Sequence, residues 1–220
     1  MRWLQAANIN LSTIKKDHRW SEVASDEQIK KTIAALLENG IDAEVVETRR
    51  DAKKKVFGII PKNAEVMTHT SVTLDTLEIS KEINESGNFD AVRPKLMAMN
   101  RETQGGEMQK LGAAADWSIG SVHAVTEDGK VVIASNSGSQ IPGYAYGSGH
   151  VIWVVGAQKI VHDLDEALER VNKHSLPLEA ERVNKAYGVP GSFVSKMLII
   201  NQETVVGRIK MIIIKEVLGF

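Results

Sequence analysis

Two short apolar runs, residues 151–155 and 211–214, constrain the fold of this chain most strongly. Both are rich in β-branched residues and are bounded by glycine or charged residues, which is typical of strands buried on both faces of a sheet. Upstream of them, strand-like segments alternate with segments of helical period, a pattern that indicates a parallel α/β sheet. Neither run approaches the roughly 20 apolar residues that a bilayer requires, so we expect no membrane span.

Local signals place the elements along the chain. Ser25 and Gln28 form a capping-box pattern, apolar residues then recur on one helical face, and Gly40 ends the helix. Acidic residues at 163, 165 and 166 favour another helix start. The sequence predicts further helices over 49–57, 74–84, 96–111 (interrupted at Gly105-Gly106) and 178–187, and strands over 43–47, 66–68, 88–92, 117–125, 131–134, 150–155, 197–201 and 208–217.

Composition excludes several classes of function. Lys plus Arg number 27 and Asp plus Glu number 28, giving a net charge of −1, which argues against nucleic-acid binding and against a polybasic membrane surface. The chain has no cysteine, so disulfides, thiolate catalysis and cysteine-ligated metal clusters are excluded. The six histidines show no metal-ligand spacing, and we expect neither a metal nor a cofactor.

The domain organisation is predicted to be simple. Residues 1–24 form an N-terminal helix or arm, which packs either on its own domain or on a partner subunit. Residues 25–220 form a single α/β domain. No uninterrupted apolar segment of the secretory type opens the chain, so we expect a cytoplasmic protein.

Two hydroxyl-rich loops are candidate ligand sites. Residues 68–73 follow a strand and precede a helix, where free amides and hydroxyls suit a phosphate or carboxylate; alternatively, Ser71 or Thr73 only caps the helix. Residues 135–139 open a long polar loop in which Gly138 allows close backbone approach; alternatively, this loop is structural. The candidate ligand-binding residues in the two loops are Thr70, Ser71, Thr73, Ser135, Asn136, Ser137, Gly138 and Ser139.

Glu127 is the candidate catalytic residue. It belongs to the tripeptide Glu127-Asp128-Gly129, which predicts a tight hairpin turn with glycine at positive φ. A carboxylate presented at a strand end can act as an acid, a base or a nucleophile. The alternative is an exposed turn-forming residue, which is the commoner meaning of this tripeptide.

Several segments resemble one known family. Residues 115–132 resemble the core of the LUD (lactate utilization) domain, in which an Ala-Asp strand leads to a Glu-x-Gly hairpin. Residues 151–161 are similar to its next strand and Lys-Ile-Val turn, and residues 163–168 to the helix that follows. Residues 71–74 are similar to its Ser-Val-Thr-Leu loop, and 208–220 to the ending of one branch of the family. Ser121 and Lys159 lie within the matching segments and complete the candidate ligand-binding residues.

The resemblance implies a fold related to ribose-5-phosphate isomerase and coenzyme A transferases. In those transferases a glutamate in a Glu-x-Gly setting is the nucleophile, which by analogy favours Glu127. The resemblance also implies a link to lactate oxidation, where LUD proteins act beside iron–sulfur proteins. Some members of the family carry cysteines or fused ferredoxin modules, and this chain has neither; it also has residues 67–70 where relatives are glycine-rich. It therefore holds no iron–sulfur cluster of its own.

These observations lead to two main functional hypotheses, besides a third in which the chain is a binding-only domain whose pocket has lost its chemistry. In the first, the chain binds a small phosphorylated or carboxylated metabolite and is associated with the utilization of lactate or other organic acids. In the second, it is a non-catalytic partner subunit of a lactate-oxidising redox complex that contains iron–sulfur proteins. Whether it is an enzyme stays open at this point. The four tryptophans and the apolar C-terminal strands allow a homodimer, and neither nucleic acid nor a membrane is an expected partner.

Overall fold

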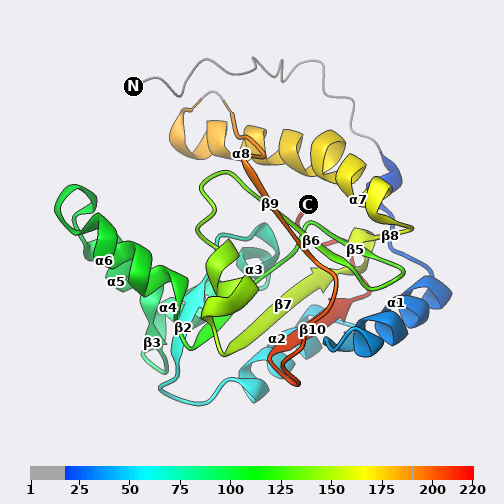
Figure 1. Cartoon of the computed structure of the whole chain (residues 1–220), viewed down its shortest axis with the longest axis horizontal. Helices are drawn as coiled ribbons and strands as arrows, with labels where there is room; N and C mark the ends of the chain where they lie inside the picture. The colour runs from blue at the N-terminus through cyan, green and yellow to red at the C-terminus, as the bar shows by residue number, and fades with distance from the viewer. Residues whose placement is uncertain (1–17, 190) are drawn as a thin grey trace.

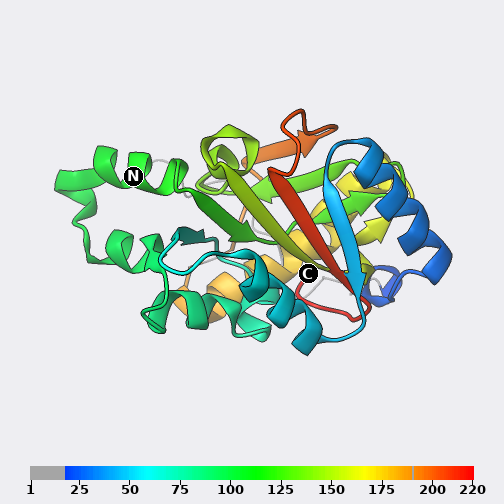
Figure 2. The same cartoon turned by 90° about the horizontal axis from the view of Figure 1, so that it is seen from below.

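A parallel sheet of six strands, sheet A, forms the centre of the computed structural model, which describes residues 18–189 and 191–220 (Figures 1 and 2). All of its neighbouring strands run in the same direction. The strand order is β1 (Asp42–Val46), β10 (Ile209–Ile214), β7 (His150–Gly156), β4 (Trp117–Gly120), β2 (Glu65–Thr68) and β3 (Asp90–Ala91).

The apolar runs of β7 and β10 serve two cores, because successive side chains point to opposite faces of a sheet. On β7, Val151, Trp153 and Val155 belong to the core beneath one face, whereas Ile152 and Val154 belong to the core beneath the other. Both strands are thus buried on both faces, as their near-continuous apolar sequence predicts.

A second sheet, sheet B, packs over one face of sheet A. Its strand order is β8 (Ile160–Val161), β5 (Ala124–Thr126), β6 (Val131–Ser135) and β9 (Lys196–Ile200). The predicted hairpin is confirmed, since β5 and β6 pair antiparallel through a turn in which Gly129 has φ +82°. A Cβ on Gly129 would lie 2.7 Å from the backbone of Ala35, so the turn also requires glycine for its close approach to the first helix.

Helices cover both sides of this pair of sheets. One face of sheet A packs against α2 (Arg49–Ile59), α3 (Val72–Thr76) and α4 (Ile79–Glu85). The opposite face packs against sheet B and α1 (Asp26–Glu38), whose predicted capping box between Ser25 and Gln28 is present. Sheet B is covered in turn by α7 (Leu164–Arg170), which continues through a π-helical turn, η5 (Val171–Ser175), into α8 (Leu176–Tyr187).

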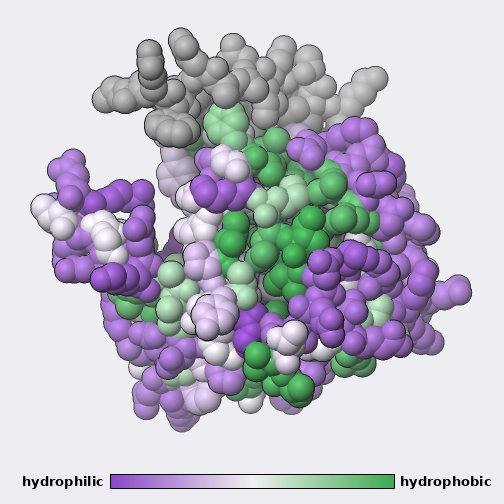
Figure 3. All heavy atoms as spheres, in the orientation of Figure 1, coloured by the Kyte–Doolittle hydropathy of each residue, from purple (hydrophilic) through white to green (hydrophobic). Residues whose placement is uncertain are grey.

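Two further helices, α5 (Val92–Ala98) and α6 (Arg101–Ala113), project from the body as an arm (Figures 1 and 2). None of the α6 side chains is buried. In the view of Figure 3 the arm is mostly hydrophilic, whereas apolar residues gather on the body over β9.

The expected fold class is confirmed: a mostly parallel sheet flanked by helices, with an antiparallel hairpin and C-terminal strands. Four element predictions are corrected. The strand expected over 117–125 is two strands in different sheets, because the chain leaves sheet A after Gly120. The helix expected over 74–84 is broken where Glu78 adopts φ +55°. The strand expected over 88–92 is confined to Asp90–Ala91, and α5 begins at Val92. The helix expected over 96–111 is two helices that separate between Ala98 and Arg101, and α6, which is kinked at Gln104, continues through Gly105-Gly106, where the interruption was expected.

Most of the predicted N-terminal helix or arm, residues 1–17, lies outside the described residues. Trp20, near its end, is buried in the core between sheet B and α7. Within the part of the chain that the structure describes, no helix combines the length and apolarity needed to cross a membrane.

Candidate functional site

A polar cleft of about 530 Å³ opens at the carboxyl ends of three strands of sheet A. Thr70, Ser71 and Thr73 follow β2, Ser121 follows β4, and Lys159 follows β7; all five line the cleft. Open parallel sheets bind ligands at this edge, because loops from several strands meet there. The topology therefore brings together candidate residues that lie far apart in the sequence.

The serine-rich loop after β6 forms another wall. Ser135, Asn136, Ser137 and Ser139 line the cleft, whereas Gly138 does not and instead shapes the loop. Its φ is +88°, and its backbone N–H donates to the Ser135 hydroxyl over 2.8 Å. Every predicted ligand-binding residue except Gly138 thus faces one cleft, and their role in binding stays a prediction.

Two of the hydroxyl groups at this cleft also form hydrogen bonds that stabilise the fold. Ser71 is the N-cap of α3 and accepts a hydrogen bond from the Leu74 backbone N–H over 3.4 Å. Thr73 donates to the carbonyl oxygen of Leu218 over 3.1 Å. Capping by Ser71, which the sequence left as an alternative, is therefore present alongside its position in the cleft.

Lys159 lies at the floor of the cleft with only 2% of its surface exposed. Its Nζ is 3.1 Å from Ser121 Oγ, 3.1 Å from the carbonyl oxygen of Val122 and 3.3 Å from Thr73 Oγ1. These partners are uncharged, and among the described residues no carboxylate forms an ion pair with this amine. Burial, together with the positive charge of Arg170, holds the pKa of Lys159 well below its usual value.

Arg170 lies fully buried beneath this floor. One of its nitrogens donates to the His123 carbonyl oxygen and, over 3.1 Å, to Ser175 Oγ. Its Nε and second terminal nitrogen have no hydrogen-bond partner among the described residues. Burial lowers the pKa of Arg170 to about 9, so it stays charged at neutral pH and adds to the positive potential under the cleft.

Two histidines that sequence reasoning missed also line the cleft, His69 and His123. Burial lowers the pKa of each to about 3, with a further contribution from neighbouring positive charges, so both are neutral at physiological pH. His123 Nδ1 accepts from the Ala134 backbone N–H over 3.1 Å, which leaves the proton on Nε2. Each lies beside a segment that the sequence did indicate: His69 precedes Thr70, and His123 follows Ser121 by two residues.

Three arginines that the sequence did not indicate also line the cleft: Arg93, Arg101 and Arg182. Arg93 donates to the Thr70 hydroxyl over 2.9 Å and to a backbone carbonyl. Arg182 pairs with Glu179 over 2.6 Å, and Glu179 is the one carboxylate side chain among the described lining residues. No ion pair to Arg93 or Arg101 forms within the described part of the chain. The cleft therefore has an excess of positive side chains.

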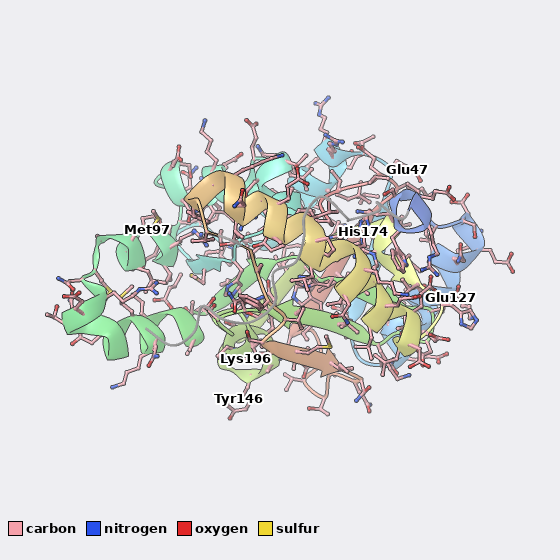
Figure 4. The ribbon with its side chains drawn as sticks, turned by 90° about the horizontal axis from the view of Figure 1, so that it is seen from above. Glu47, Met97, Glu127, Tyr146, His174 and Lys196 are labelled. Carbon is pink, nitrogen blue, oxygen red and sulfur yellow. The ribbon has the colours of Figure 1, made fainter. Side chains whose placement is uncertain are left out.

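The structure places Glu127 away from this cleft, in the β5–β6 turn beside α1 (Figure 4). Its carboxylate accepts from Lys31 Nζ over 2.7 Å and from the Gln28 side-chain amide over 3.1 Å. The hydrogen bond from Lys31 lowers the pKa of Glu127, so the group is ionised and paired. This arrangement ties the hairpin to α1, and it does not bring Glu127 together with the candidate ligand-binding residues.

Replacing Glu127 by Gln tests this structural reading. We expect a fall in melting temperature of no more than about 4 °C near neutral pH, because partly exposed ion pairs contribute little. The ionised form of Glu127 stabilises the fold above its unfolded pKa of about 4.3, so the difference from the wild type should begin to shrink as the pH falls below that value and should vanish only below the lowered pKa of the folded state. Thermal unfolding across this pH range measures it. A loss of ligand response in Glu127→Gln would instead support a catalytic or binding role.

The fold and the cleft define an α/β protein with a cation-lined cavity at the carboxyl edge of its parallel sheet. The LUD domain model matches residues 29–214, and the chain belongs to this family. The family name links it to lactate utilization. A search of curated protein sequences found no match.

A solved structure has the same fold. The crystal structure of a DUF162 family protein from Deinococcus radiodurans at 1.70 Å resolution is similar with a TM-score of 0.51 and 11% sequence identity. The match covers 86% of this chain and 95% of that chain. At this identity the similarity extends to the fold alone.

Proposed function

We propose that the cleft binds a small metabolite that has a phosphate or carboxylate group, and that this ligand connects the chain to the utilization of lactate or other organic acids. The observation that carries the proposal is the excess of positive side chains without carboxylate partners. Arg93 and Arg101 line the cleft without an ion pair among the described residues, and an anionic ligand would supply the counter-charge that those residues do not.

The absence of a counter-charge costs free energy when the charged group is buried. A charged group taken out of water loses hydration that an opposite charge or hydrogen bonds must replace. Arg170 is buried and charged, and two of its nitrogens have no hydrogen-bond partner within the described residues. Each charge-assisted hydrogen bond to a bound anion contributes about 1.5–3 kcal/mol.

The size and lining of the cleft suit a metabolite rather than a macromolecule. Its volume of about 530 Å³ lies within the range typical of small-molecule sites, roughly 300–1,000 Å³. The hydroxyls of Thr70, Ser137 and Ser139 line it and can orient polar groups of a ligand, because a hydroxyl both donates and accepts.

A thermal-shift panel of inorganic phosphate, ribose 5-phosphate, lactate and pyruvate at matched ionic strength tests the proposal. A ligand at a hundred times its Kd stabilises the folded state by about 2.7 kcal/mol, which for a chain of this size raises Tm by roughly 5–10 °C. We expect such a rise for at least one of the anions. Arg101→Gln should diminish it, whereas Arg50→Gln, on the outer surface of α2, should leave it unchanged.

A flat panel would contradict the proposal. The alternative function, a non-catalytic subunit in a lactate-oxidising complex, would then be favoured. That alternative requires iron–sulfur proteins to co-purify with the tagged chain from its own cells.

A further inference from the structure

Three oxygen atoms lie within hydrogen-bond distance of Lys159 Nζ, and a neutral amine can satisfy all three. The Val122 carbonyl oxygen can only accept, and Thr73 uses its own hydrogen on Leu218, so Thr73 Oγ1 accepts from Lys159 as well. A neutral amine has two hydrogens, and these two acceptors use both. The third partner, the Ser121 hydroxyl at 3.1 Å, has no other hydrogen bond among the described residues. It can therefore donate to the amine lone pair or to a ligand.

The surroundings of the amine favour nucleophilic chemistry. A lysine becomes nucleophilic near neutral pH when it is desolvated or placed next to another cationic group. Both conditions hold here, because Lys159 is 2% exposed and the positive charge of Arg170 disfavours a second charge on Lys159. The amine nevertheless lines the cleft, so a ligand can reach it.

We propose that Lys159 is a nucleophile that forms an imine with a carbonyl carbon of the ligand, and that the ligand is an anionic aldehyde, ketone or oxo acid. This inference rests on the proposed anion-binding function and narrows its ligand class. Arg93 and Arg101 line the same cleft and would hold the anionic group, while the carbonyl group of the ligand reaches the floor.

The reaction balances without an oxidant or reductant. The Lys159 nitrogen attacks the carbonyl carbon, a C–N bond forms, and the π electron pair of the carbonyl moves to its oxygen. The nitrogen loses both of its protons in the course of the reaction, and both leave with that oxygen as one molecule of water. The Ser121 hydroxyl, next to Nζ, can pass a proton from the nitrogen to the oxygen. The product is an imine between protein and ligand.

Reductive trapping tests this inference on the whole chain. The protein is incubated at pH 7 with glyoxylate or glyceraldehyde 3-phosphate and cyanoborohydride, and the modified lysines are mapped by peptide mass spectrometry. An exposed lysine near its usual pKa is neutral in only about one molecule in a thousand at this pH. We therefore expect Lys159 to be modified at least tenfold faster than Lys185, an exposed lysine on α8.

Two comparisons test whether the modification depends on the anionic group of the ligand and on Lys159 itself. Acetaldehyde, which lacks an anionic group, should modify Lys159 more slowly than glyoxylate does, whereas Lys185 should not distinguish the two. Lys159→Arg should lose the rapid modification while the remaining lysines react as before. The inference fails if Lys159 is unmodified, or reacts no faster than Lys185, in protein that a panel anion stabilises. If no anion stabilises the protein and Lys159 is unreactive, the proposed function fails as well.

Discussion

Replacing Lys159 by methionine is expected to reduce the affinity of the cleft for pyruvate about thirtyfold. The side chain lies at the cleft floor, and removing one hydrogen bond to an anionic ligand costs about 2 kcal/mol, which corresponds to that factor. Methionine has a similar length and no charge, so it fills the space without adding a polar group that needs a partner. Titration calorimetry on both proteins measures the effect.

The stability of the fold should change far less than the affinity. Lys159→Met removes a desolvated amine but leaves the Val122 carbonyl without this partner, and these effects oppose each other. Lys185→Met is the matched control, because this lysine is exposed and pairs only with Glu181 among the contacts described. It should bind pyruvate as the wild type does. Equal affinities for Lys159→Met and the wild type would contradict the placement of the ligand.

Replacing Arg208 by methionine is expected to lower the free energy of unfolding by about 3–5 kcal/mol, because it leaves a buried charge unpaired. The side chains of Arg208 and Glu203 are only 9% and 8% exposed, and they pair over 2.6 Å. Arg208 also donates to the carbonyl oxygens of Ser148 and Tyr144, over 3.0 and 2.8 Å. It thereby attaches the π-helical turn η3 (Gly143–Gly147), which bears the cleft residue Tyr144, to the start of β10.

Urea unfolding measures this loss in the free energy of unfolding, and two further variants show whether it comes from the buried ion pair. Glu203→Gln in the Arg208→Met background should recover part of the loss, because it removes the uncompensated carboxylate. Arg49→Met breaks an exposed pair with Glu216 and should cost at most about 1 kcal/mol. An equal loss of stability from Arg49→Met and Arg208→Met would show that burial does not increase the contribution of the Arg208–Glu203 pair to stability.

Local signals in the sequence determined the elements and part of the cleft. The capping box at Ser25, the turn glycine at 129 and the β-branched runs act over a few residues, so their effects can be predicted without the rest of the chain. The two hydroxyl-rich loops were recognised for the same reason, since each follows an apolar strand. The family could also be recognised, because its motifs are contiguous segments of sequence.

Distant contacts escaped prediction. The strand expected over 117–125 divides after Gly120, where a Cβ would lie 1.7 Å from the hydroxyl oxygen of Tyr144, a contact with a residue far along the chain. The strand order places β10, the last strand, between β1 and β7, which no local pattern indicates. The position of Glu127 depends on α1, whose Lys31 pairs with it, and not on its own turn.

The sequence by itself therefore determined the α/β class, the family and the hydroxyl groups available for a ligand. Only the tertiary structure decided that Lys159 is buried at the floor of one cleft with Arg170 beneath it, and that Glu127 lies elsewhere. The physical reason is that burial, charge and hydrogen bonding depend on the neighbours that the sheet topology brings together. Those neighbours come from strands and helices that are distant in the chain.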